Sequence, residues 1–180
     1  MRPYFILFCC TVLMGQSANS LVTEAKFPWT IVSTNLLKMA EKMPDENYSF
    51  KPMPEMESFA QRVMHIAGAN LNVCQGVLGV QAPRPAQSTA KADLVALLKQ
   101  SSAACDRAFD SLNDSSALEK ISSRLGGPFP PEPMRTKLIT LTNMVRHSNE
   151  MYGYMSVYLD RKSTRLNSSH IPLSRMPSSA

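Results

Sequence analysis

Histidine is the residue type in this sequence with the clearest capacity for chemistry, and the chain contains three, at positions 65, 147 and 170. An imidazole can coordinate a metal ion through a ring nitrogen, and it can accept or donate a proton near neutral pH. His65 and His147 lie in long segments with helical periodicity, whereas His170 lies in a serine-rich tail. We therefore treat His65 and His147 as candidates and give His170 no functional role.

His147 belongs to a long proline-free stretch, residues 134–160. At about 100° per residue, its apolar side chains fall on one broad arc of a helix. His147 lies at the flank of that arc, and Met151, one turn later on the same side, lies inside it. Taken alone, His147 is either a hydrogen-bonded histidine at the edge of a core or a ligand that needs partners from elsewhere in the chain.

His65 belongs to a second helical segment, residues 58–80, for which Ser58 is a suitable N-cap. It does not lie on the apolar stripe of that segment. It projects from the opposite side, among the small and polar residues Gln61, Gly68, Ala69, Asn72 and Gly76. Each glycine in a helix interior costs about 1 kcal/mol relative to alanine, so this face suggests a close backbone approach or a pocket.

Two further segments show helical spacing, and prolines and polar clusters separate all four. One covers residues 29–42, and the other opens at Ser88 or Thr89 and continues to about Leu112. A weaker segment over residues 117–125 adds a turn or a short helix. Four long helices without strand-like alternation predict an all-α four-helix bundle.

The cysteines bear on how the helices are connected. Cys74 and Cys105 each lie about 15 residues into the second and third helices. In an antiparallel pair they would be separated by roughly 15 Å, whereas a disulfide tolerates about 7 Å between Cα atoms. A bonded pair therefore predicts parallel second and third helices with a stretched crossover over residues 79–88. Two buried free thiols are the alternative.

The N-terminal residues predict export. Residues 1–20 combine an early cation, Arg2, with an apolar core and small residues at Ala18 and Ser20, which is typical of a cleaved secretory signal. The apolar core of roughly a dozen residues is too short to span a bilayer, which needs about 20. We expect a secreted or periplasmic protein with no stable membrane anchor after signal cleavage.

The C-terminal residues differ from the rest of the chain. Residues 162–180 are rich in serine and lack both periodicity and acidic residues. They resemble a translated sequencing-adapter sequence, and a genuine disordered tail is the alternative. The expected organisation is a signal peptide over residues 1–20, one helical domain over residues 21–161 and a disordered or artefactual tail over residues 162–180.

The charge of the domain argues against one class of partner. Of the 19 Lys and Arg residues, five lie outside residues 21–160, which leaves 14 against 14 Asp and Glu. The domain is therefore close to neutral, and the basic character belongs to the two ends. We expect no nucleic-acid partner, because the electrostatic basis for phosphate binding is missing.

Two motifs, SFAQRVMHIAGAN around His65 and RHSNEMYG around His147, together resemble the DinB-like superfamily, secreted members included. The resemblance extends through AEKMPDENYSFKPMPE and covers nearly all of residues 30–161. It implies an up-down-down-up four-helix bundle with a crossover between helices two and three. It also implies a divalent metal (zinc, nickel or iron) held by one histidine on the second helix and two, spaced HxxxH, on the fourth.

The sequence departs from this ligand pattern at one position. His65 matches the first histidine and His147 the second, but Met151 stands where the third is expected. A thioether is a soft, neutral ligand that suits Cu(I) better than zinc. Glu150 lies about 100° around the helix from Met151 and does not readily replace it. The metal set His65, His147 and Met151 therefore predicts a degraded divalent-metal site.

Two classes of function remain open. The first is an exported metalloprotein with residual transferase or hydrolytic activity, because the resemblance includes thiol-dependent transferases in which a metal lowers the pKa of a thiol. The second is a non-enzymatic bundle that binds a small molecule or forms a homodimer through a Met-rich and Tyr-rich surface. That surface comprises Met151, Tyr152, Tyr154, Met155 and Tyr158, and ordinary core packing is its alternative explanation. The sequence identifies neither a catalytic residue nor a substrate.

Overall fold

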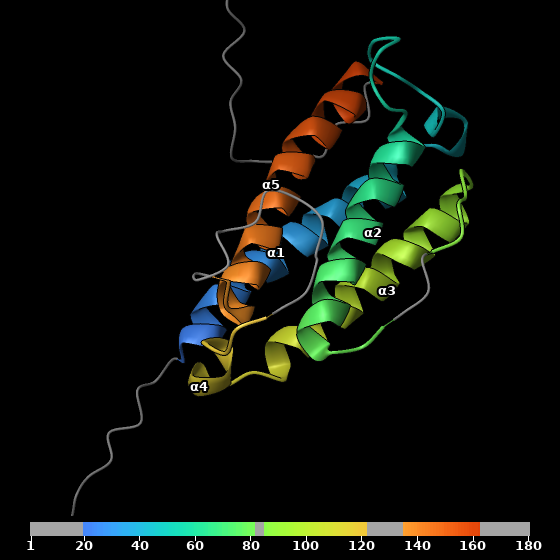
Figure 1. Ribbon diagram of the computed structural model, residues 1–180. Helices are drawn as coiled ribbons and strands as arrows, with labels where there is room; N and C mark the ends of the chain where they lie inside the picture. The colour runs from blue at the N-terminus through green and yellow to red at the C-terminus, as the bar shows by residue number, and fades with distance from the viewer. Residues whose placement is uncertain (1–19, 82–84, 122–134, 163–180) are drawn as a thin grey trace, which may run out of the picture.

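The computed structural model describes residues 20–81, 85–121 and 135–162, and four long helices pack together in it as a bundle (Figure 1). These helices are α1 (Leu21–Lys42), α2 (Phe59–Leu78), α3 (Lys91–Asp110) and α5 (Lys137–Arg161). The 3-10 helix η1 (Asp45–Asn47) follows α1, and the short helix α4 (Asp114–Ala117) follows α3. The described ranges contain no β-strand, only an isolated bridge between Lys120 and Thr136. The all-α four-helix bundle is confirmed.

The predicted end segments lie almost wholly outside these ranges. Only Ser20 of the predicted signal peptide and Lys162 of the predicted tail are described. Ser20 is the N-cap of α1, and its Oγ accepts a hydrogen bond from the backbone N–H of Thr23 at 3.1 Å. Among the described helices, none is both long and apolar enough to cross a bilayer.

A disulfide fixes the direction of α3 relative to α2. Cys74 and Cys105 are bonded, with Cα atoms 4.9 Å apart, and each lies about three quarters of the way along its helix. The two helices therefore run parallel, and the free-thiol alternative is wrong. The crossover between them is also confirmed, with residues 82–84 outside the described ranges.

The other two helices run opposite to this pair. On α5, Met144 contacts the disulfide while His147, one turn later, meets His65, which precedes Cys74 on α2. The sequences of α2 and α5 therefore advance in opposite directions. Ion pairs between α1 and α3 show the same relation, because Lys26 pairs with Asp110 and Glu41 pairs with Lys99. The up-down-down-up order follows.

Helix α1 begins eight residues earlier than residue 29, where we placed its start from the sequence. Pro28 lies inside it, although proline removes a backbone donor and usually marks a helix end. The turns before Pro28 bury Val22, whose backbone N–H donates to Oδ1 of Asp114 at 3.4 Å. Tertiary contact with α4 thus stabilises a helical extension that the local sequence disfavours.

The N-cap of α2 was predicted correctly and that of α3 was not. Ser58 and Gln61 exchange side chain to backbone hydrogen bonds of 2.7 and 3.2 Å, which form a capping box. The N-cap of α3 is Ala90, not Ser88 or Thr89. Ser88 instead stabilises the preceding turn, since its Oγ accepts from the Ala90 N–H at 3.1 Å and donates to Asp93 at 2.8 Å.

The segment after α3 also differs from the prediction. Helix α3 ends at Asp110, close to the predicted end near Leu112, and Asn113 then caps α4 through a hydrogen bond of 2.9 Å from the Ser116 N–H. Of the predicted weak helix over residues 117–125, only Ala117 is helical in the described part. The polar run therefore follows the end of α3 and also starts the short helix α4.

Large aromatic side chains fill the space between the helices. Trp29, Phe59, Phe109 and Tyr158 are fully buried. Trp29 donates from Nε1 to Oδ1 of Asp106 at 2.9 Å, and the Tyr158 hydroxyl donates to the backbone oxygen of Glu57 at 2.6 Å. The polar groups of Trp29 and Tyr158 thus keep hydrogen-bond partners when they are buried. Their burial therefore adds apolar stabilisation without a large desolvation cost.

Candidate functional site

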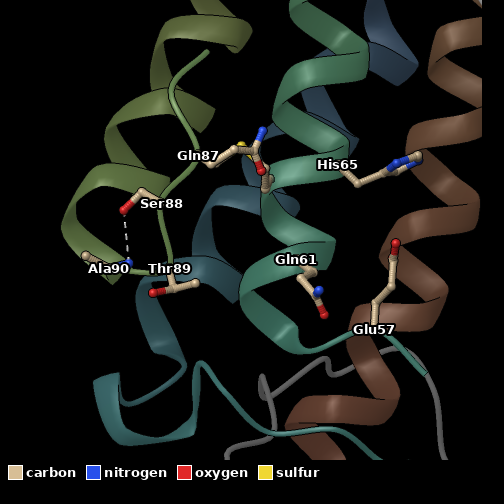
Figure 2. Close-up of a pocket in the computed structure, with 8 residues that line it drawn as sticks. Glu57, Gln61, His65, Gln87, Ser88, Thr89 and Ala90 are labelled. Atoms are coloured by element: carbon tan, nitrogen blue, oxygen red, sulfur yellow. Dashed lines mark hydrogen bonds between the residues drawn. The ribbon is translucent and has the colours of Figure 1, made fainter. Parts of the chain in front are cut away.

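The contact between α2 and α5 brings His65 and His147 together. Their Nε2 atoms lie 3.2 Å apart, and their ring planes meet at 73° with centroids separated by 5.3 Å. Figure 2 shows the side chain of His65 directed toward α5. His65 is exposed, whereas the side chain of His147 is 31% exposed at the edge of the buried face of α5. One imidazole thus lies at the protein boundary and the other in solvent.

The electrostatic surroundings favour the neutral form of His147. Partial burial lowers the pKa of this imidazole below its ordinary value, the neighbouring His65 lowers it further, and Glu150 acts in the opposite direction. Oε2 of Glu150 lies 3.8 Å from Nδ1 of His147. A neutral imidazole keeps a lone pair on one ring nitrogen, which metal binding and general-base chemistry both need.

Met151 lies one turn beyond His147 on α5, and it is 4% exposed. Its Sδ atom lies 3.7 Å from Nη1 of Arg62, a residue of α2. Nη2 of Arg62 pairs with Glu57 at 3.0 Å, and the guanidinium lies 5.3 Å from the centroid of the Tyr154 ring. The third candidate ligand is therefore in contact with a cation.

Sequence reasoning missed Arg62. The residue was visible in the motif SFAQRVMHIAGAN, three positions before His65, and residues three apart share a helix face. That spacing could have placed Arg62 beside His65. It could not have shown that Met151 lies opposite, because the two residues are 89 positions apart in the sequence.

Comparison with known proteins identifies the family. A sequence model described as the DinB superfamily matches residues 29–155. This chain belongs to the DinB superfamily. It also resembles the crystal structure of a DinB-like protein from Bacillus cereus, with a TM-score of 0.60 at 18% sequence identity over 75% of this chain and 88% of that one. That similarity shows a shared fold. No curated protein matches this DinB-superfamily chain.

Metal binding is common in the DinB superfamily, so we tested whether the residues of this member suit a divalent ion. Zinc binds imidazole nitrogen at about 2.0–2.1 Å, and two nitrogens 3.2 Å apart are compatible with one shared ion. A third donor is lacking, because the described parts of the chain contain no group of three or more His, Cys, Asp and Glu side chains placed to hold a metal. Two imidazoles, a thioether and an adjacent guanidinium do not fit a tightly bound divalent ion.

A polar cavity of about 680 Å³ adjoins His65 in this DinB-superfamily bundle. It opens between α2 and the segment that leads into α3, and its lining residues are Glu57, Gln61, Met64, His65, Gln87, Ser88, Thr89 and Ala90 (Figure 2). A second cavity of about 540 Å³ between α2 and α3 shares Met64, Gln87 and Ser88 with it. The amide and hydroxyl groups can donate and accept hydrogen bonds to a small polar molecule.

The proposed Met-rich and Tyr-rich surface of α5 is wrong. Met151, Met155 and Tyr158 are buried, Tyr152 is partly buried, and only Tyr154 is exposed. Tyr158 packs against Phe59, with ring centroids 5.9 Å apart. Met151, Met155 and Tyr158 belong to the core of the DinB bundle because their spacing places them on the inward face of α5.

Proposed function

We propose that this chain is an exported DinB-superfamily protein whose divalent-metal site is degraded, so that its activity does not depend on a tightly held zinc, nickel or iron ion. The contact between Met151 and Arg62 carries this proposal. His65 and His147 remain as a pair at metal-ligating separation. The position one turn beyond His147 supplies a buried thioether rather than a third imidazole.

The remaining histidine pair retains a limited chemistry. With Nε2 atoms 3.2 Å apart, one neutral imidazole can donate a hydrogen bond to the other, so the pair can hold and pass one proton. A divalent ion bound by these two rings alone would complete its coordination with water and would exchange readily.

Zinc content tests the proposal. We expect the wild-type protein, equilibrated with zinc and then desalted, to contain much less than one zinc per chain by elemental analysis. His65→Ala should change that amount little, because no tight site exists to be lost. One zinc per wild-type chain that disappears in His65→Ala would contradict the proposal. Circular dichroism of both proteins controls for folding.

Export is the second part of the proposal. The disulfide between Cys74 and Cys105 supports it, because such bonds form and persist mainly in oxidising compartments. Mass spectrometry of the protein expressed with all 180 residues should find an N-terminus near Leu21 in the exported fraction. An uncleaved chain that stays in the cytoplasm would contradict export.

The polar cavity favours a second candidate function, non-enzymatic binding of a small polar molecule. Its lining offers the amide of Gln87 and the hydroxyl of Thr89, together with the amide nitrogen of Gln61, whose oxygen accepts from the Ser58 N–H. A thermal-shift screen with uncharged polyols, sugars and amides should find a compound that raises the melting temperature of the wild type but not of Gln87→Leu. Equal shifts in both proteins would place the binding elsewhere.

A further inference from the structure

Arg62 and Met151 form the contact next to the histidine pair along α2 and α5. Arg62 precedes His65 by three residues, and Met151 follows His147 by four. Both spacings place the two residues of each helix on one face. Because α2 and α5 run in opposite directions, the two cross-helix contacts lie side by side. The neighbour of the imidazole pair is therefore a guanidinium held against a thioether.

Three interactions hold the guanidinium in this place. Arg62 pairs with Glu57 at 3.0 Å, contacts Sδ of Met151 at 3.7 Å and lies over the ring of Tyr154 at 5.3 Å from its centroid. Its side chain is only 16% exposed, and its Nε atom is buried without a hydrogen-bond partner in the described structure. The guanidinium therefore places a positive charge beside Met151.

A fixed cation at this position acts on metal binding in two ways. It repels a second cation, and the repulsion is twice as large for a divalent ion as for a monovalent ion at the same distance. It also contacts the end of the side chain at position 151, where a ligand from α5 would present its donor atom. The carboxylates of Glu57, beside Arg62, and Glu150, beside His147, offset the charge only in part, because their side chains are 46% and 48% exposed and screened by water.

We infer that Arg62 is a specificity-determining residue that excludes divalent metal ions from the His65–His147 pair. Two features then weaken metal binding in this chain: the lack of a third imidazole at position 151 and the positive charge of Arg62. Restoring histidine at position 151 alone does not restore tight binding, whereas restoring it and removing the charge of Arg62 does. This inference rests on the proposed function, because it explains why the site does not hold a divalent ion.

The inference is tested by the zinc affinities of full-length variants. Competition with a chromogenic chelator measures these affinities. The central comparison is Met151→His against the double variant Arg62→Gln/Met151→His. We expect the double variant to bind one zinc at least about 100-fold more tightly, since the juxtaposition of like charges costs several kcal/mol. The matched control, Arg62→Lys/Met151→His, keeps the charge and should stay within about tenfold of Met151→His.

A second neutral variant protects the test against a folding defect. Arg62→Met/Met151→His keeps an apolar stem in the position of the arginine stem, and circular dichroism reports whether each variant is helical. Equal zinc affinity of Met151→His and the folded neutral double variants would overturn the inference. Tight zinc binding by the wild type would instead contradict the proposed function, so the two failures are distinguishable.

Discussion

His65 and His147 are 82 positions apart in the sequence, yet their Nε2 atoms lie 3.2 Å apart across the contact between α2 and α5. Beside them along the same helices, Arg62 lies against the buried Met151. The pair is therefore bordered by a cation, while His65 also lines a polar cavity. This arrangement suits proton exchange and polar binding better than it suits a divalent ion.

The pKa of His147 gives a first prediction. Burial and the neighbouring His65 lower that pKa in the folded protein. As the pH falls below the ordinary histidine value of about 6.5, the unfolded chain therefore binds a proton that the folded chain does not. His147 therefore contributes to the free energy of unfolding above pH 6.5, and this contribution is lost as the pH falls further.

Urea unfolding between about pH 8 and pH 5, with a chelator present, measures this effect. We expect the stability of His147→Asn to fall less steeply over that range than the stability of the wild type. Arg161→Gln, an exposed residue in the last turn of α5, serves as a control and should keep most of the wild-type slope. Identical slopes for wild type and His147→Asn would show that His147 does not titrate as described.

The disulfide gives a second prediction. It closes a loop with a sequence separation of 31 residues, for which the chain-entropy model gives a stabilisation of about 3–4 kcal/mol. We expect Cys74→Ala/Cys105→Ala to lose about that much unfolding free energy. The wild-type protein with its disulfide reduced should show a similar loss of unfolding free energy relative to the oxidised wild type. A loss below about 1 kcal/mol would mean that the bond adds little to the parallel α2–α3 packing.

The hydrogen bond from Trp29 to Asp106 gives a third prediction. Trp29 is fully buried, and Asp106 accepts its indole N–H at 2.9 Å. Asp106→Ala leaves that donor unsatisfied, which should cost about 1–3 kcal/mol of stability. Asp106→Asn keeps an acceptor oxygen and should cost less. Trp29 is the single tryptophan of the chain, so its fluorescence reports both unfolding and any local change. Equal stability of Asp106→Ala and Asp106→Asn would count against a stabilising hydrogen bond.

The hydroxyl of Tyr48 gives a fourth prediction. It is buried and donates to the backbone oxygen of Ala40 at 2.7 Å. Burial raises the pKa of Tyr48, and the carboxylates of Asp45 and Glu41 raise it further. The folded protein should keep this proton above about pH 10 while the unfolded chain releases it, so stability falls as the pH rises through that range.

Tyrosinate absorbance and urea unfolding check this fourth prediction. Tyr48→Phe should leave the alkaline absorbance change of the folded protein almost unaltered, because Tyr48 does not contribute to it. The variant should lose about 1 kcal/mol at neutral pH with its hydrogen bond, and its stability should fall less in alkali. A smaller absorbance change in the folded variant near pH 10 would show that Tyr48 ionises normally.

Sequence periodicity was sufficient for the parts of the fold that depend on local interactions. The Ser58 cap, the apolar face of α5 and the four helical segments follow from residues within one or two turns of each other. The position of His147 at the edge of a buried face was predictable for the same reason. The start of α1 was not predictable in this way. The helix continues on the N-terminal side of Pro28 because Val22 makes contacts outside its own helix.

By itself, the sequence determined a helical bundle, a pair of candidate histidines and the absence of a third imidazole at position 151. Periodicity shows which residues share a face but not what that face meets, so the bonded state of Cys74 and Cys105 stayed open until the helices were placed. Only the tertiary structure decided between core packing and an interaction surface for the methionines and Tyr158 of α5. It alone set Arg62 against Met151, because that contact joins two helices whose approach is decided by the packing of the whole core.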